Sequence, residues 1–268
     1  MRFATPSDAF GRCSDPDCQT RYSVTHCKSK DMLEAKYYTG KIEAGCDEAG
    51  RGCLAGPVFA GAVILPDDVC ERCPELAAGL NDSKQLTEKK RYQLRELIER
   101  DALAWAVGMV SNEEIDKINI LRASILAMHR ALDQLQIVPQ AIIVDGNRFV
   151  EWKPQVSKTG TDYLMHARVS LREFCPPAES GRVPYTTIVK GDGKYLAIAA
   201  ASILAKTYRD DFMMKIHEEY PMYRWDKNKG YPAPVHRQAI KEHGTTPYHR
   251  MSFNLLGNSP QLELDFGE

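Results

Sequence analysis

The amino-acid sequence predicts an α/β fold in which a mixed β-sheet is flanked by helices, with a helical portion at the C-terminal end. Two observations support this fold class. Apolar runs bounded by glycines or acids at 44–65, 103–110, 141–145 and 186–190 are typical of buried strands. Segments with apolar residues at helical spacing alternate with these runs, and this alternation favours a sheet covered by helices.

The first predicted element is the stretch 44–65, in which two apolar halves are joined by a glycine-rich turn. Asp47 and Glu48 stand at the entry to the turn, and a Gly-Arg-Gly sequence follows at 50–52. Carboxylates at the end of a buried strand are costly unless a positive charge lies beside them, and a metal ion is the usual solution. The alternative is a simple hairpin whose acids face water.

A loop over 66–83 and a charged helix over about 87–100 are predicted next, followed by the strand at 103–110. Ser111 begins a Ser-x-x-Glu capping box, which indicates the start of another helix. A longer helix over about 120–135 has apolar residues at intervals of three and four. The residues at this spacing, which we expect to face the core, are Leu121, Ile125, Met128, Leu132 and Leu135.

The second half of the chain contains two short strands, at 141–145 and 186–190, and each is followed by glycine. The longest predicted helix covers about 195–219, and the alanines of its first half allow close packing on a sheet. A loop over 228–231 leads to a last helix at 234–242.

Composition divides the chain into a folded domain and three other segments. We expect a disordered N-terminal extension over 1–31, because it is polar and lacks apolar periodicity. One domain over 32–256 then contains an insertion at about 151–183, and the tail at 257–268 is expected to be flexible.

Charge and hydropathy limit the possible functions. The 268 residues are 43% hydrophobic and 26% charged, with a net charge of −1, so any site for a polyanion must be a local patch. No apolar run reaches the ~18–20 residues that span a bilayer, and the N-terminus lacks the apolar core of a signal peptide. We therefore expect a cytoplasmic protein without a membrane segment.

Eight cysteines raise the question of a zinc site. Cys70 and Cys73 have the spacing of half a site, but the other candidate ligands fit no standard pattern. Those candidates are Cys13, Cys18, His26 and Cys27. We expect reduced, unpaired thiols instead, with Cys46 and Cys53 buried as small hydrophobic side chains.

Three predicted strands each deliver acids to one end. The acids are Asp47, Glu48, Asp145 and Asp192. Sites of open α/β sheets lie at strand ends, and clustered carboxylates repel one another unless divalent cations neutralise them. Oxygen ligands suit Mg²⁺ or Mn²⁺ better than zinc, and two such ions about 3.5–4 Å apart can catalyse phosphoryl transfer.

The chain also resembles a known family. Asp-Glu-Ala-Gly-Arg-Gly at 47–52, followed by Leu-Ala-Gly-Pro-Val, is similar to the opening motif of the type 2 ribonucleases H (ribonuclease HII). Further similar motifs follow in the family's order over most of residues 41–256. They are Asn81-Asp-Ser-Lys84, Val144-Asp145-Gly146, Lys190-Gly191-Asp192, Ala199–Ile203 with Ala205-Lys206, Lys229-Gly230-Tyr231, and His249-Arg250 with Ser252-Phe253.

The resemblance implies a ribonuclease-H-like fold and roles for individual residues. Asp47, Glu48, Asp145 and Asp192 match the family's four catalytic, metal-binding acids. The residues that match its substrate contacts are Gly50, Arg51 and Gly52 (a loop that senses the 2′-hydroxyl), Asn81, Ser83 and Lys84 (phosphate contacts), and Tyr231 (stacking on a sugar). These types suit nucleic acid, because glycine exposes backbone N–H groups, lysine meets phosphate and a ring meets a sugar face.

The implied activity is metal-dependent hydrolysis of the RNA strand of RNA/DNA hybrids and cutting 5′ to single ribonucleotides in duplex DNA. Water attacks the phosphate, which leaves 3′-hydroxyl and 5′-phosphate ends. We expect two Mn²⁺ or Mg²⁺ ions and a monomer. A local basic surface is predicted from Lys84, Lys190, Lys194, Arg209, Lys227 and Lys229.

Two departures from the family pattern leave alternatives open. The long stretch between Asp145 and Asp192 contains Asp162, which is a remote rival for the fourth acid. The extension at 1–31 is too short for the folded N-terminal domain of ribonuclease HIII. A hybrid-binding module without catalysis and a zinc-binding adaptor are the rival functions; concentrated acids beside phosphates argue against the former.

The C-terminal tail gives one further hypothesis. Its sequence, Gln261-Leu-Glu-Leu-Asp-Phe266, resembles short peptides that dock on bacterial sliding clamps. The alternative, which we favour, is a frayed C-terminus without a partner.

Overall fold

The computed structural model describes residues 33–80, 86–153 and 182–257. The predicted N-terminal extension, most of the predicted insertion and the tail therefore lie outside the described residues, and the domain boundaries stay predictions. Asn81, Ser83 and Lys84 also lie outside the described residues.

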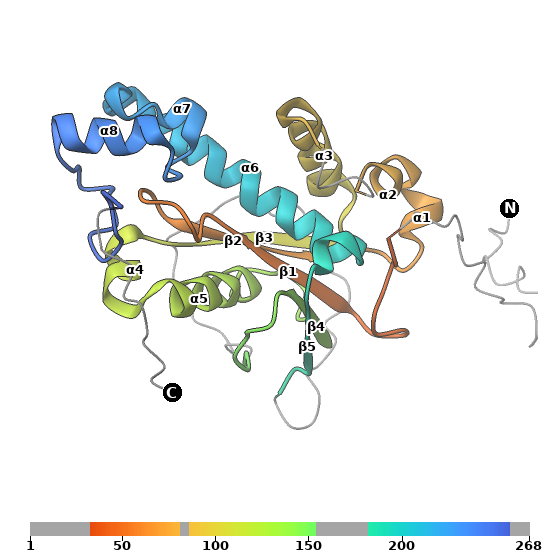
Figure 1. The fold of residues 1–268 in the computed structure, drawn as a ribbon. Helices are drawn as coiled ribbons and strands as arrows, with labels where there is room; N and C mark the ends of the chain where they lie inside the picture. The colour runs from red at the N-terminus through yellow and green to blue at the C-terminus, as the bar shows by residue number, and fades with distance from the viewer. Residues whose placement is uncertain (1–32, 81–85, 154–181, 258–268) are drawn as a thin grey trace, which may run out of the picture. The chain divides into compact units, whose positions relative to one another are not determined.

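The core of the fold is a five-stranded mixed sheet in the order β3-β2-β1-β4-β5 (Figure 1). The strands are β1 (Glu43–Ala49), β2 (Val58–Ile64), β3 (Ala104–Val110), β4 (Ala141–Asp145) and β5 (Tyr185–Ile188). β2 runs antiparallel to both β1 and β3, whereas β4 runs parallel to both β1 and β5. The predicted mixed α/β sheet is confirmed.

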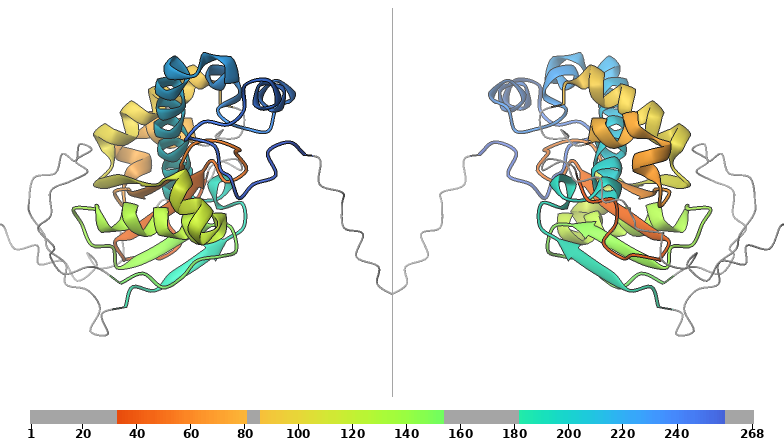
Figure 2. Two further views of the ribbon diagram at one scale, coloured as in Figure 1. Left: turned by 90° about the vertical axis from the view of Figure 1, so that its left-hand side faces the viewer. Right: turned by 90° about the vertical axis from the view of Figure 1, so that its right-hand side faces the viewer.

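Helices cover both faces of the sheet. The helices are α1 (Val69–Arg72), α2 (Pro74–Leu80), α3 (Glu88–Asp101), α4 (Asn112–Ile118), α5 (Ile120–Asp133), α6 (Leu196–Glu219), α7 (Trp225–Asn228) and α8 (Pro234–His243), with 3₁₀ turns η1 (Gly191–Gly193) and η2 (Pro221–Tyr223). The long α6 packs on β1 and β2, and α5 packs on β2 and β3 from the opposite side (Figures 1 and 2). α7 and α8 form the predicted C-terminal helical portion.

Two glycines let α6 lie directly on the sheet. A Cβ on Gly45 would overlap the backbone of Ala197, and a Cβ on Gly61 would overlap the carbonyl of Ala201. The alanine-rich first half of α6 therefore packs as closely as its sequence predicts. This contact fixes the helix across the two central strands, next to the acids of β1.

Local signals placed several helix starts correctly. The Thr87 hydroxyl accepts the backbone N–H of Lys90 at the start of α3. At Ser111 both bonds of the predicted capping box form, because the serine hydroxyl accepts the N–H of Glu114 and the glutamate accepts the N–H of Ser111. Such caps satisfy the N–H groups that a helix end leaves unpaired.

The structure corrects three details of the prediction. The predicted loop over 66–83 contains the helices α1 and α2, because Leu76 and Leu80 have an apolar cluster to bury against. On α5, Leu121 is 38% exposed instead of buried, since the helix turns its alanines toward the close approach at Gly108. β5 ends at Ile188, and Lys190 adopts a left-handed conformation that begins a turn.

The C-terminal helices have an apolar cluster of their own. Tyr223 and Trp225 are fully or almost fully buried, and their rings stack with centroids 5.0 Å apart. Leu54 and Ala55 belong to the same cluster, so the turn between β1 and β2 packs against the C-terminal helices. Among the described helices, none is long and apolar enough to cross a bilayer.

Candidate active site

The predicted acids lie at the carboxyl ends of neighbouring strands. Asp47 and Glu48 are near the end of β1, and Asp145 is the last residue of β4. Because β1 and β4 are parallel, their carboxyl ends meet at one edge of the sheet. Asp192 belongs to the 3₁₀ turn η1 that follows β5, and β5 is parallel to β4.

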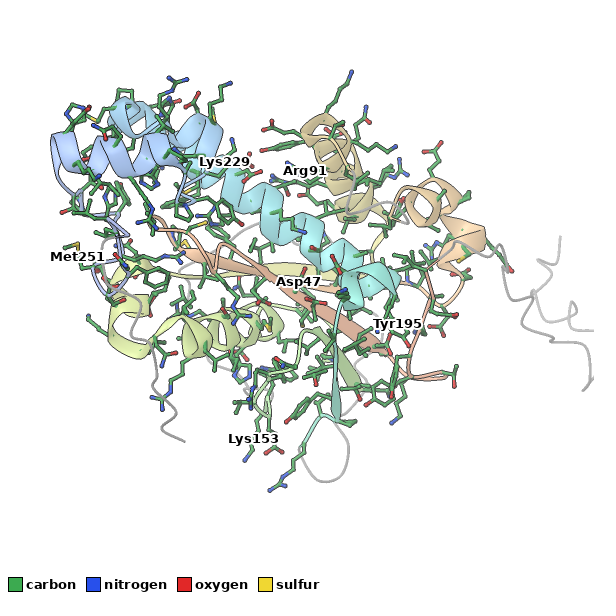
Figure 3. The ribbon with its side chains drawn as sticks, in the orientation of Figure 1. Asp47, Arg91, Lys153, Tyr195, Lys229 and Met251 are labelled. Atoms are coloured by element: carbon green, nitrogen blue, oxygen red, sulfur yellow. The ribbon has the colours of Figure 1, made fainter. Side chains whose placement is uncertain are left out.

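Asp47 is the most deeply buried of these acids, at 6% exposure (Figure 3). Burial, together with the charges of Glu48 and Asp145, raises the pKa of its carboxyl to about 8. The Asp47 carboxylate accepts the backbone N–H of Glu48 at 2.7 Å, as well as a hydrogen bond from the side chain of Ser202. The protein alone therefore disfavours the ionised form that a metal would need.

A polar pair on α6 supports Asp47 from behind. Ser202 and Lys206 are one helical turn apart, and the Lys206 Nζ donates to the Ser202 Oγ at 2.7 Å. The Lys206 charge acts against the rise in the pKa of Asp47. The pair orients the carboxylate and supplies part of the positive charge that the strand end lacks.

One carboxylate oxygen of Glu48 accepts no hydrogen bond from the described residues. Its Oε1 accepts from the Arg51 Nη1 at 3.0 Å, whereas its Oε2 is buried and has no hydrogen-bond partner in the described part of the chain. Burial also raises the pKa of Glu48, with Arg51 acting in the opposite direction. A buried carboxylate oxygen without a partner, beside a second buried carboxylate, is a donor set that fits a hard divalent cation.

Asp145 links the fourth acid to the site. Its Oδ1 accepts the backbone N–H of Gly191 at 2.6 Å, and this bond holds the turn that carries Asp192 beside the end of β4. Over residues 33–80, 86–153 and 182–257, however, the structure contains no group of three or more His, Cys, Asp or Glu side chains that could already hold a metal ion. The shared four-acid site thus stays a prediction.

The Gly-Arg-Gly loop begins immediately after β1. Gly50 has φ +96°, which favours glycine, and a Cβ there would overlap the side chain of Arg209. Arg51 and Gly52 are both exposed. Two carbonyl groups of the loop point inward to the buried guanidinium of Arg250, whose Nη2 donates to Gly50 O at 2.7 Å and whose Nη1 donates to Arg51 O at 3.0 Å.

Arg209 corrects the predicted basic surface. It is 2% exposed, and its guanidinium donates to three backbone carbonyls, those of Ala55, Pro57 and Lys229. The sequence shows that this position carries a positive charge, but not whether the side chain points to the surface or to the interior. The reason is that residues on every side of α6 are buried. Arg209 therefore supports the turn from inside instead of facing a ligand.

Tyr231 lies beside this loop and is 49% exposed. The Arg209 guanidinium lies 5.9 Å from the centre of the Tyr231 ring. The Tyr231 hydroxyl hydrogen-bonds the Cys53 thiol. The preceding Gly230 accepts the backbone N–H of Leu54 at 2.7 Å. The loop between α7 and α8 is thus joined to the turn after β1, and the Tyr231 ring is available to a ligand.

Sequence reasoning missed the supporting roles of Arg250, Ser202 and Lys206. Each belongs to a motif that the sequence singled out, but motif membership does not say which backbone or carboxylate group a side chain contacts. Only the i, i+4 spacing of Ser202 and Lys206 offered a local signal, because such residues share one helix face. Cys46 and Cys53 are free and buried, as predicted.

A family model for ribonuclease HII matches residues 44–256. The ribonuclease HII of Phocaeicola vulgatus is 60% identical over 225 residues, which cover 84% of this chain and 95% of that protein. The ribonuclease HII of Bacteroides thetaiotaomicron is 61% identical over 225 residues, with the same coverage of both chains.

Solved structures agree on the fold. The ribonuclease H2 of Pyrococcus horikoshii OT3 is 28% identical and has a TM-score of 0.58, with 80% of this chain and 94% of that chain covered. The PCNA:RNase HII complex from Archaeoglobus fulgidus gives a TM-score of 0.57 at 24% identity, covering 78% and 94%. Bst-RNase HIII in complex with Mn²⁺ has a TM-score of 0.54 at 17% identity, with 80% of this chain and 67% of that chain covered. The last two likenesses support the fold alone.

Proposed function

The chain belongs to the ribonuclease HII family of metal-dependent endonucleases that act on RNA/DNA hybrids, and from this premise we propose that it also cuts 5′ to single ribonucleotides in duplex DNA. The observation that carries the proposal is the position of the Gly-Arg-Gly loop, exposed at Arg51 and Gly52, directly beside the acids of β1. A site that cuts at one ribonucleotide must read a single 2′-hydroxyl, and exposed backbone groups next to the reacting phosphate can do so.

Asp47, Glu48, Asp145 and Asp192 are the proposed metal ligands. The unpartnered Oε2 of Glu48 and the raised pKa of Asp47 support this assignment, because a bound cation would satisfy the first and restore the ionised form of the second. We propose two ions, either Mg²⁺ or Mn²⁺. When bound, such ions act as Lewis acids that activate water and stabilise charge on the phosphate oxygens.

The remaining residues are proposed to hold the substrate. Arg51 and the glycines on either side of it face the ribonucleotide, and the exposed ring of Tyr231 stacks on the sugar beyond the cut. Lys190 and Lys194 are exposed near the proposed fourth acid and are suited to phosphate contacts. Asn81, Ser83 and Lys84 keep their proposed phosphate contacts on the basis of sequence alone.

The experiment uses a DNA duplex with one embedded ribonucleotide, an all-DNA duplex of the same sequence as control, and Mg²⁺ or Mn²⁺. We expect cutting only at the ribonucleotide, with 3′-hydroxyl and 5′-phosphate ends, and loss of cutting in Asp192→Asn. Cutting of long RNA stretches alone would refute the proposed role of the loop. Tight binding without cutting in either metal would favour a hybrid-binding module instead.

Docking of the tail at 257–268 on a sliding clamp, through its Gln-Leu-Glu-Leu sequence, is the second proposal, and its test decides between docking and the frayed end favoured above. The support is the sequence of the tail, with its alternating apolar residues suited to a groove. Deletion of residues 260–268 should abolish binding to a purified clamp and leave cleavage of a short duplex unchanged. No binding by the full chain would refute the proposal.

A further inference from the structure

Arg250 is fully buried; its guanidinium lies 5.2 Å from the centre of the Phe253 ring, and in the described part of the chain it donates hydrogen bonds only to backbone carbonyls. Besides its bonds to Gly50 and Arg51, its Nε donates to the carbonyl of Gly56 at 2.9 Å. In the described part of the chain, neither Arg250 nor the equally buried Arg209 has a carboxylate partner within salt-bridge distance. Two buried cations therefore lie under one turn.

Burying two cations without a carboxylate partner costs free energy that a purely structural contact would not require. Burial lowers the pKa of Arg250 to about 10, and the nearby charge of Arg209 acts in the same direction. Buried charges without a counter-ion are strongly disfavoured, whereas apolar side chains can fill such a space at lower cost. The planar fork of arginine, however, is able to bind several carbonyls at once, which neither an apolar side chain nor the point charge of lysine reproduces.

The two short bonds have a consequence on the outer side of the loop. In a trans peptide the C=O and the following N–H point in opposite directions. When Arg250 draws the carbonyls of Gly50 and Arg51 inward, the N–H groups of Arg51 and Gly52 point away from the interior. Neither N–H has an acceptor among the described residues, and both residues are exposed.

The segment that carries Arg250 is itself held on both sides. Asp116 at the end of α4 accepts the backbone N–H groups of Met251 and Ser252 at 2.9 and 3.0 Å. On the other side, the Arg250 N–H donates to the Leu54 carbonyl at 2.8 Å. The backbone at Arg250 is therefore held by α4 and by Leu54, outside the residues 50–52 that the guanidinium orients.

We propose that Arg250 is a positioning residue for ribonucleotide selection: it fixes the outward direction of the Arg51 and Gly52 N–H groups, which bind the ribose at the cut site. This inference rests on the proposed function and assigns its selectivity to a buried residue that does not touch the substrate. Arg209 supports the same turn from the side of α6.

The test compares wild type with Arg250→Lys, which keeps the charge but loses the fork. The dissociation constants for a duplex with one ribonucleotide and for the all-DNA duplex are measured in Ca²⁺, which occupies oxygen sites with looser geometry than Mg²⁺. The preference ratio is the dissociation constant for the all-DNA duplex divided by that for the single-ribonucleotide duplex. We expect this ratio to fall by about tenfold or more, because charge-assisted bonds that orient both donors are lost. Binding of the all-DNA duplex should stay unchanged, and kcat/KM in Mg²⁺ on the single ribonucleotide should fall by a similar factor.

Arg237→Lys is the matched control. Arg237 also donates to two backbone carbonyls, those of Asn254 and Leu255, neither of which belongs to the loop at 50–52. It should keep the wild-type ratio. An unchanged ratio in Arg250→Lys, or an equal loss for both duplexes, would overturn the inference.

Two further outcomes are distinguishable. If Arg250→Lys does not fold, Asp116→Ala replaces it, since that half-buried side chain holds the Arg250 segment through Met251 and Ser252. A fall in the ratio supports the inference, and an unchanged ratio overturns it. If wild type neither prefers nor cuts the single-ribonucleotide duplex, the proposed function itself fails, and the inference fails with it.

Discussion

Replacement of Asp47 by asparagine is expected to abolish cleavage and, at the same time, to stabilise the metal-free fold. Asp47 is nearly fully buried beside two other acids, and its pKa is raised from 3.8 to about 8 by burial and by the charge of Glu48. Asparagine has almost the same shape and still accepts the hydrogen bond of Ser202. It carries no charge, so the variant avoids the penalty of a buried carboxylate.

The magnitude follows from proton linkage. Because the folded pKa lies above the unfolded one, the folded state holds the extra proton, and this contribution to stability is lost as the pH rises from about 4 to about 8. The roughly three pH units between the unfolded pKa and pH 7 correspond to about 4 kcal/mol at about 1.4 kcal/mol per unit. We take half of this as the smallest gain expected from Asp47→Asn, which raises Tm by about 4 °C or more for a chain of this size.

The assay is thermal unfolding of both proteins in EDTA at pH 5 and pH 8, and then with added Mg²⁺ or Mn²⁺. The variant should melt higher in EDTA, more so at pH 8, and its advantage should shrink when metal stabilises wild type. Glu43→Gln is the control: burial raises the pKa of Glu43 as well, but the N–H groups of Tyr37 and Tyr38 that its carboxylate accepts oppose this rise, so its replacement should give a smaller gain. Equal melting of wild type and Asp47→Asn in EDTA at pH 8 would refute the reasoning.

Three further predictions concern other parts of the fold. Gly45→Ala should destabilise by about 2 kcal/mol or more in a denaturant melt, because the new Cβ would overlap the backbone of Ala197. Stability should fall as the pH drops from 6.5 to about 4, because burial lowers the pKa of His249 to about 4 and the unfolded chain then binds the extra proton; His249→Gln should flatten this dependence in pH-resolved melts. Ser202→Ala should lower kcat about tenfold and leave KM nearly unchanged in steady-state kinetics, because the hydroxyl orients Asp47 and not the substrate.

Each of these has a control and a contrary outcome. Gly52→Ala meets no atom within 4 Å and should change stability little, so equal effects at Gly45 and Gly52 would contradict the close-packing argument. Replacement of the exposed His243 by glutamine should leave the acid dependence intact. A rise in KM for Ser202→Ala without a fall in kcat would assign that serine to substrate binding instead.

Local signals in the sequence were sufficient for most elements. The capping box at Ser111 acts through neighbours in the chain, so its pattern predicts where the helix begins. The glycines of the first two strands and the alanines of α6 meet in one close contact, so their pattern predicts that the helix packs on the sheet. The helices α1 and α2 were missed because they are short and their apolar residues follow no full helical period. Leu121 was misplaced because α5 turns toward a glycine on β3, which its own periodicity does not reveal.

The positions of Asp47, Glu48 and Asp145 were predictable, because each lies at or near the end of an apolar strand, whereas Asp192 lies in the turn after β5. Their role as metal ligands stays a prediction. The supporting residues were not predictable. Arg209 and Arg250 bind carbonyl groups of the turn after β1. Every residue has a backbone carbonyl, so the sequence does not indicate which carbonyls a buried arginine binds. For Arg209 the sequence even favoured a surface role, because a charged side chain is mostly exposed unless its environment supplies several acceptors.

The bond between Arg250 and Gly50 joins residues 200 positions apart, which has a consequence for synthesis on the ribosome. At about 5–20 residues per second, about 10–40 s separate the translation of the loop from that of the arginine that orients it. During this interval β1 and β2 can pair, but the turn between them lacks its anchor. The proposed selectivity would therefore be among the last properties that the nascent chain acquires, after the strands that carry the acids have been made.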